Sequence, residues 1–187
     1  GTEAYAAYGI GVQILSFSFV IGFGFSIAGA TLVGQHLGAQ NKDQAKRAGW
    51  GAMRLSIISM TFFGIIIVTF AEPLARFMID NDEVVRLTVI FIWLLGSMQP
   101  LMAIEFSLGG ALRGAGDTKT PLVITLTCLL FIRVFLAVVF FLLDASIEII
   151  FSTLLADYIV KGFLYVSRFK SDRWMNVLKI KEVDQQL

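Results

Sequence analysis

The stretch from Ser18 to Gly38 carries a small residue at every fourth position. Residues four apart lie on the same face of an α-helix, so this spacing predicts a helix with one face of nearly bare backbone. The other faces carry large apolar side chains, and no formally charged residue occurs between Ala4 and Asn41. Such a helix suits lipid on most sides and a closely packed helix on the last. The small residues predicted to form this packing face are Ser18, Gly22, Ser26, Ala30, Gly34 and Gly38.

Four further apolar segments follow, which disfavours the alternative of one buried helix in a large soluble core. Hydrophobic residues make up 57% of the 187 residues and charged residues 16%. A membrane core of about 30 Å needs roughly 20 mostly apolar residues per helix. The sequence therefore predicts an all-α integral membrane protein with five transmembrane helices. We place them near 7–38, 50–71, 84–112, 121–143 and 147–169, within a helical region 1–169 that precedes a basic tail at 170–187.

Proline, glycine and capping residues mark where these helices bend or begin. Gly96 and Pro100 lie inside the third segment, so we expect a bend there, because proline removes a helical hydrogen bond. A hinge at these two residues would absorb a change of shape. Asn41 is the predicted N-cap of the second helix, and Thr120, just before Pro121, that of the fourth.

The connections between the segments differ in charge. The connections after the first and third segments, together with the tail, are basic, whereas the others are mostly acidic. The positive-inside rule therefore places the basic connections and the C-terminus in the cytoplasm, and Gly1 on the outer side of a plasma membrane that is crossed several times. An outer N-terminus leads us to expect at least one helix before Gly1. The basic residues are Lys42, Lys46, Arg47, Arg113, Lys119, Arg168, Lys170, Arg173, Lys179 and Lys181.

Four ionisable residues lie inside the predicted spans, where a charge is costly and usually faces the bundle interior or a water-filled cavity. Glu105 has no basic residue one turn away on its own helix, so we predict that it binds a coupling ion or a cationic substrate. Asp157 is the second candidate. It precedes Lys161 by four residues, an order that favours an intrahelical pair, so a purely structural pair is the competing interpretation. Arg133 and Lys161 are the predicted charge partners.

Several uncharged residues are weaker candidates. Flexible methionine and aromatic side chains accept many apolar shapes and can line a drug-binding cavity, although they more often form core. These residues are Met98, Met102, Phe91 and Trp93, and the polar candidates are Gln13, Gln35, Gln99 and His36.

The sequence contains none of the common nucleophile, zinc or phosphate-binding motifs. With one histidine and one cysteine, it is poorly supplied for metal or nucleophilic catalysis. We therefore expect no enzyme, no catalytic residue, no metal site and no cofactor, with a proton or sodium ion as the coupling ion. The basic tail is a topology signal, so we expect membrane lipid and no nucleic acid as a partner.

Two connections resemble those of the multidrug and toxic compound extrusion (MATE) family. They are A-T-L-V-G-Q-H-L-G-A-Q-N-K-D-Q-A-K-R-A-G at 30–49 and G-A-L-R-G-A-G-D-T-K-T-P at 110–121. The resemblance implies a transporter of twelve helices in two six-helix lobes. This chain would supply five helices of one lobe, the C-terminal one, and its partner would be the missing remainder of the same transporter.

The resemblance also implies secondary active antiport, in which cationic and amphipathic drugs and toxic compounds leave in exchange for protons or sodium ions. Some family members carry an acidic residue on the helix that corresponds to 84–112, at about Met102. The acid in this sequence is Glu105, about one turn away, so its role rests on its own chemistry. Two alternatives remain open: a flippase for lipid-linked oligosaccharides of the same superfamily, and a membrane scaffold that transports nothing.

Overall fold

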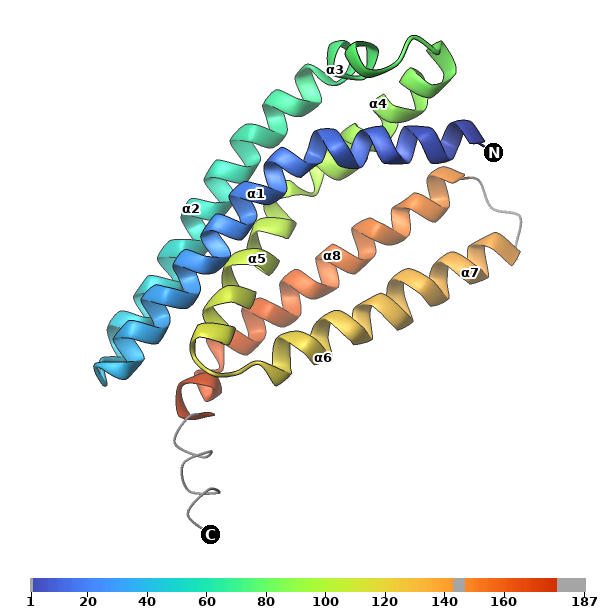
Figure 1. The fold of residues 1–187 in the computed structure, drawn as a ribbon. Helices are drawn as coiled ribbons and strands as arrows, with labels where there is room; N and C mark the ends of the chain where they lie inside the picture. The colour runs from blue at the N-terminus through green and yellow to red at the C-terminus, as the bar shows by residue number, and fades with distance from the viewer. Residues whose placement is uncertain (1, 143–146, 178–187) are drawn as a thin grey trace.

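The structure is a computed structural model that describes residues 2–142 and 147–177, and within these ranges all regular structure is helical (Figure 1). This confirms the all-α class. The helices are α1 (Thr2–Gly38), α2 (Lys42–Thr69), α3 (Ala71–Met78), α4 (Asp82–Ser97), α5 (Gln99–Gly114), α6 (Lys119–Thr127), the π-helix η1 (Cys128–Val134), α7 (Phe135–Leu142), α8 (Ile147–Lys170) and the 3₁₀ helix η2 (Arg173–Asn176).

Most of the predicted spans are long and apolar enough to cross a membrane. In the described part of the chain, α1, α2 and the run Lys119–Phe140 meet this requirement, and so does the bent pair α4–α5 taken as one span. α8, which carries Asp157 and Lys161 in its middle, is not among the helices found to meet it. The fifth transmembrane span therefore stays a prediction.

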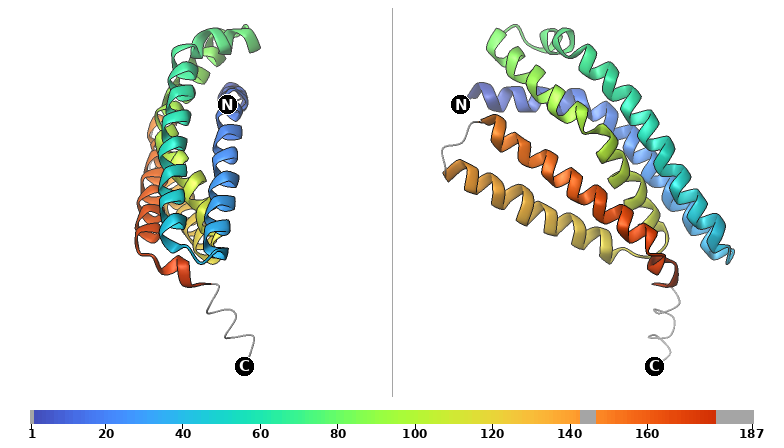
Figure 2. Two further views of the ribbon diagram at one scale, coloured as in Figure 1. Left: turned by 90° about the vertical axis from the view of Figure 1, so that its left-hand side faces the viewer. Right: turned by 180° about the vertical axis from the view of Figure 1, so that it is seen from behind.

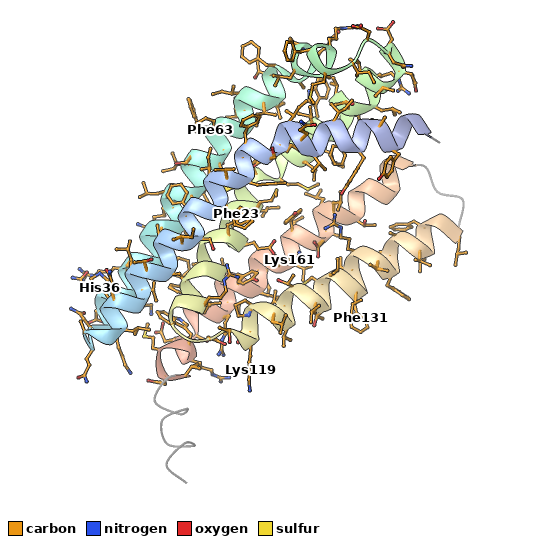
Figure 3. All side chains as sticks on the ribbon, viewed as in Figure 1. Phe23, His36, Phe63, Lys119, Phe131 and Lys161 are labelled. Carbon is orange, nitrogen blue, oxygen red and sulfur yellow. The ribbon has the colours of Figure 1, made fainter. Side chains whose placement is uncertain are left out.

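Large apolar side chains cover the outside of the bundle. Phe131 is 66% exposed and Phe63 43%, and both are labelled in Figure 3. Exposed phenylalanine, leucine and isoleucine also follow the outer faces of α1, α2 and α6. A surface of this kind is stable against lipid, where a soluble protein would have polar residues.

The alternate connections lie at the same end of the bundle. The α1–α2 connection, the α5–α6 connection and the end of α8 are together at the bottom of Figure 1, whereas the N-terminus and the α3–α4 turn are at the top. The basic connections therefore share one end, as the charge pattern predicted. Lys179 and Lys181 of the tail lie outside the described residues.

α1, α2 and α5 pack together most extensively, and α8 lies between α5 and the α6–α7 run (Figures 1 and 2). The predicted small-residue face of α1 makes the contact with α5. A Cβ atom added to Gly110 would meet the carbonyl oxygen of Ser26, and one added to Gly114 would meet that of Ala30. Small residues on both helices thus bring the two backbones into contact.

The same face continues to Gly22 and Gly34 but ends before Gly38. A Cβ atom added to Gly22 would lie 2.6 Å from the Phe106 ring, and one added to Gly34 would lie 3.1 Å from the carbonyl oxygen of Gly114. Gly38 is exposed, with nothing within 4 Å of an added Cβ. The prediction that Gly38 packs against a neighbouring helix is therefore wrong, because α5 ends at Gly114 and α1 runs on past it.

The predicted bend at Gly96 and Pro100 is confirmed. α4 ends at Ser97, Pro100 lies in the first turn of α5, and the two helices meet at 51°. α2 passes close to this break, since a Cβ atom added to Gly64 would lie 3.3 Å from the carbonyl oxygen of Gly96.

One of the two predicted helix caps is present. The Asn41 side chain accepts a hydrogen bond from the backbone N–H of Gln44 (3.1 Å) and so caps α2. Thr120 does not cap α6, which already begins at Lys119. The N-cap residue is Thr118, whose side chain makes no capping hydrogen bond, and Asp117, one residue earlier, accepts a hydrogen bond from the Thr120 backbone N–H through its Oδ1 (3.2 Å).

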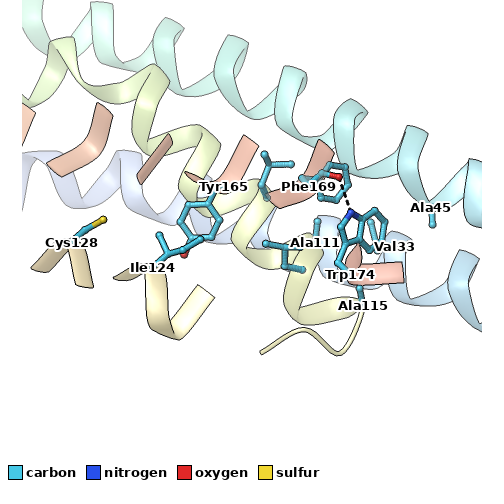
Figure 4. Packing of buried hydrophobic residues seen from close by; sticks show 11 residues of the cluster. Val33, Ala45, Ala111, Ala115, Ile124, Cys128, Tyr165, Phe169 and Trp174 are labelled. Atoms are coloured by element: carbon cyan, nitrogen blue, oxygen red, sulfur yellow. Dashed lines mark hydrogen bonds between the residues drawn. The ribbon is translucent and has the colours of Figure 1, made fainter. Parts of the chain in front are cut away.

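The predicted tail begins with a folded segment. After Lys170 the chain turns back, and the Trp174 ring is fully buried and stacked on Phe169, with 4.6 Å between ring centroids (Figure 4). The indole N–H donates to the Phe169 carbonyl oxygen (2.8 Å). Lys46 of α2 pairs with Asp172 (2.7 Å). The segment that follows α8 therefore closes over the beginning of α2.

Candidate ion-coupling and substrate site

Three of the four predicted ionisable residues form one buried cluster. The Lys161 ammonium lies 3.0 Å from Asp157 Oδ2 and 3.6 Å from Glu105 Oε1. The Asp157 side chain is fully buried, that of Lys161 is 7% exposed and that of Glu105 22%. Glu105 thus has a basic partner on another helix, which the spacing along its own helix could not reveal.

Helix packing places these side chains. Asp157 and Lys161 are one turn apart on α8 and therefore share a face. α8 packs against α5 at Gly162, next to Lys161, where an added Cβ atom would make ordinary contacts with the side chains of Leu101 and Ile104 at 3.8 and 3.9 Å. The bend before α5 sets the direction of the helix that carries Glu105.

Among these three side chains two carboxylates face one ammonium, and Arg113 adds a second cation in the pocket beside them. Neither carboxylate oxygen of Asp157 accepts a hydrogen bond within the described residues, so the ion pair with Lys161 is the interaction that compensates its burial there. A buried carboxylate without such compensation is strongly destabilising, and two carboxylates share one ammonium here.

A pocket of about 240 Å³ opens beside the cluster, between α1, α5, α6 and α8. The Lys161 ammonium also lies 5.3 Å from the centroid of the Tyr158 ring, within the range of a cation–π contact. The lining thus combines one carboxylate, from Glu105, with two cations, from Arg113 and Lys161, and with several aromatic rings, on which an organic cation can stack. The residues that line the pocket are Phe23, Glu105, Phe106, Arg113, Thr125, Tyr158, Lys161 and Tyr165, and Figure 3 labels Phe23 and Lys161.

Arg133 does not join this cluster. It is half-buried in η1 and forms no ion pair with any residue that the structure describes. Its predicted role as a charge partner of Glu105 or Asp157 is therefore absent here, because Lys161 occupies the position between the two acids.

The weaker candidates take different positions. Met98, Met102 and Phe91 are buried in the core, and Trp93 is 58% exposed, so none of them lines the pocket. Gln99 is fully buried at the break between α4 and α5, and neither polar atom of its side chain has a hydrogen-bond partner in the described structure. No group of metal-ligating side chains occurs in the part of the chain that was described.

Sequence reasoning missed the role of Arg113, which was counted only as a basic residue of a connection. Its guanidinium lines the pocket, and its Nη2 donates a hydrogen bond to Ser26 Oγ on α1 (2.9 Å). The sequence did contain a signal that Arg113 lies on the same face of α5 as Glu105, because Glu105, Gly109 and Arg113 are spaced by four residues. The aromatic lining had no comparable signal, since aromatic residues occur on every face of these helices.

An all-helical bundle with apolar spans and a charged cluster at a pocket between its helices is the architecture of a polytopic membrane transporter. A family model described as MatE matches residues 1–139. The chain belongs to this transporter family, the MATE family, which confirms the resemblance seen in its two connections.

Individual relatives support the same assignment. The chain is 36% identical over 183 residues to a protein of Thermotoga maritima named probable multidrug resistance protein NorM, a match that covers 93% of this chain and 38% of that protein. A protein of the same name from Mannheimia succiniciproducens is 32% identical over 128 residues, covering 68% of this chain and 28% of the relative. The chain therefore spans well under half the length of these relatives.

Proposed function

We propose that this chain forms five helices of one lobe of a secondary active antiporter that exports cationic and amphipathic compounds in exchange for protons or sodium ions. The observation that carries this proposal is the Glu105–Lys161–Asp157 cluster, in which two carboxylates share one ammonium beside an aromatic-lined pocket. The names of the relatives, which are multidrug resistance proteins, support the same substrate class.

In this proposal the two carboxylates share Lys161 and one exchangeable cation. When a proton or sodium ion neutralises one carboxylate, Lys161 remains paired with the other. An organic cation in the pocket competes with the coupling ion for the same negative charge, which makes binding of the two mutually exclusive. The bend between α4 and α5 and the close crossing of α1 and α5 are the elements through which occupancy would change the shape of the lobe.

The test is export of an ethidium-like dye by the full-length transporter that contains this chain, with and without a proton or sodium gradient. We expect Glu105→Gln and Asp157→Asn each to abolish gradient-dependent export while the protein still reaches the membrane. Glu72→Gln is the matched control, because Glu72 is an exposed acid paired with Arg76 on the surface helix α3, and it should export as the wild type does.

Lys161 gives a sharper version of the same test. Lys161→Met removes the ammonium that Glu105 and Asp157 share, so it should bind the dye more tightly than the wild type and lose coupling to the gradient. Wild-type export by Glu105→Gln would remove Glu105 from the mechanism. Absence of export together with binding of a lipid pyrophosphate would favour the flippase, and absence of both would favour the scaffold.

A further inference from the structure

The outer face of α2 has a basic pocket that the cluster around Lys161 does not involve. The pocket measures about 500 Å³ and lies near the beginning of α2. Two of its arginines, Arg47 and Arg54, are exposed and form no ion pair within the described residues. The residues that line it are Asp43, Lys46, Arg47, Trp50, Gly51 and Arg54.

The other lining residues fix the shape of the pocket, and none of them forms an ion pair with either arginine. Lys46 is held by Asp172, and the Trp50 ring packs edge-on against Phe169, with 5.2 Å between centroids. Trp50 therefore forms a fixed wall. Gly51 forms the floor between the two arginines. The space above it is open, because nothing lies within 4 Å of a Cβ atom added there. Asp43 is the one acidic residue and lies at the outer rim, in the first turn of α2.

The depth of the pocket along α2 matches the membrane surface. About 20 residues are needed to cross the apolar core, and counting back from Phe70 at the other end of α2 reaches Gly51. Trp50 is then at the interface, where tryptophan is enriched. Arg47 lies about one turn outside this level and Arg54 about one turn inside, from where a long side chain reaches back to the surface.

The same face of α2 becomes apolar below the arginines. Ile58 is 66% exposed and Phe62 60%, and both follow Arg54 at helical spacing. The face thus combines two cations, which form no ion pair with any described residue, at the level of lipid headgroups with apolar side chains at the level of the acyl chains. An anionic phospholipid matches this arrangement, because it has a negatively charged headgroup above two long hydrocarbon chains.

We propose that the pocket lined by Arg47, Trp50, Gly51 and Arg54 binds the phosphate headgroup of an anionic phospholipid, whose acyl chains lie along Ile58 and Phe62. The two arginines contact the phosphate oxygens, Trp50 packs against the glycerol region, and Gly51 gives the headgroup access to the helix backbone. This lipid site is separate from the proposed transport site and does not depend on transport.

The experiment uses the full-length transporter, purified in a neutral detergent and titrated with phosphatidylglycerol, phosphatidylcholine or inorganic phosphate. Lipid binding is read by native mass spectrometry, and the shift in melting temperature by thermal unfolding. We expect phosphatidylglycerol to bind and raise the melting temperature, phosphatidylcholine to do so less, and inorganic phosphate at the same concentration to have no effect. An equal effect of phosphate would mean an anion site only and would overturn the proposal.

Three variants locate the site. Removing a basic residue near a charged surface weakens lipid binding about five-fold, so Arg47→Gln/Arg54→Gln should bind phosphatidylglycerol about 30-fold more weakly. Gly51→Leu should also weaken binding although both arginines remain, because it fills the floor of the pocket. Lys119→Gln is the control for a single basic residue, since Lys119 is an exposed cation at the same end of the bundle (Figure 3), and it should bind as the wild type does.

Wild-type binding by the double arginine variant would overturn the proposal, as would an equal loss in Lys119→Gln. If phosphatidylglycerol has no effect on the wild type while Gly51→Leu lowers its melting temperature, the pocket is occupied by another segment of the transporter and not by lipid.

Discussion

Asp117 shows how much a single side chain contributes in this fold. It lies in the connection between α5 and α6, is almost fully buried, and accepts hydrogen bonds from Arg168 Nε and Nη2 (2.9 and 2.6 Å) and from Thr120. Burial alone would raise the pKa of this carboxyl. The hydrogen bonds from Arg168 and Thr120 outweigh burial and hold the pKa below its ordinary value. One carboxylate thus joins the end of α5, the beginning of α6 and the end of α8.

Asp117→Asn should lower the stability of the full-length protein by about 2 kcal/mol at neutral pH, because it removes charge-assisted hydrogen bonds from a buried site. The stabilisation is fully present above the ordinary pKa of about 4 and is lost as the pH falls through the lowered native value. The melting temperature of the wild type should therefore fall more steeply below pH 4 than that of the variant.

The control is Asp172→Asn, which removes a partner of Lys46 at a half-exposed position, where an ion pair contributes less than about 1 kcal/mol. Equal losses of melting temperature in the two variants would contradict the role assigned to Asp117.

The residues of the site were only partly predictable. Glu105, Asp157 and Lys161 were found from the sequence because a charge inside an apolar run is costly and therefore conspicuous. Their grouping into one cluster could not be predicted. The rule that residues four apart share a helix face finds partners on one helix, whereas Glu105 meets its partner Lys161 on another. Arg133 satisfied the same sequence criterion and lies apart from the cluster, which shows that the criterion detects charge in the membrane and does not detect contact.

At the scale of the helices, the close packing of α1 against α5 could be predicted in part from the sequence. The small-residue stripe predicted which face of α1 is buried, and Ser26 and Ala30 of that face contact Gly110 and Gly114. The stripe did not reveal the partner helix, because small residues also occur along α2 and α5. The wide π-helical turn η1 within the fourth predicted segment had no signal of its own.

Gly110→Ala should destabilise the full-length protein by about 2 kcal/mol, because the added methyl group meets the backbone of Ser26, which cannot move aside as a side chain can. The matched control is Gly24→Ala, at a helical position with nothing within 4 Å of an added Cβ. Alanine forms helices better than glycine, so the control should be neutral or slightly stabilising.

Thermal unfolding of the two variants in detergent measures the difference. A Gly110→Ala variant as stable as Gly24→Ala would show that α1 and α5 do not cross as closely as described.

At the scale of the whole molecule, the sequence predicted that alternate connections lie at the same end of the bundle, because each helix crosses it once. It did not predict the fold of the segment after α8. That segment was expected to be a basic tail, and composition alone gives no indication that Trp174 is buried against α8. The orientation of the bundle in the membrane remains a prediction from charge.

Cysteine labelling tests that orientation. In a background in which Cys128 and any other cysteine of the full-length protein are replaced by serine, Gln40→Cys marks the basic end and Asp80→Cys the opposite end, both at exposed positions. A maleimide that cannot cross the membrane should label Asp80→Cys in intact cells and Gln40→Cys only after permeabilisation. Labelling of Gln40→Cys in intact cells would invert the topology.

The position of Trp174 also has a consequence for biosynthesis. The buried cluster to which it belongs also contains Val33 and Ala45, which leave the ribosome long before it does. Until residue 174 is synthesised, Phe169 lacks its stacking partner and the start of α2 lacks its cover. The basic end of the bundle is thus closed by a segment that is translated after all the helices it covers, so this end can close only once the whole of α8 has left the ribosome.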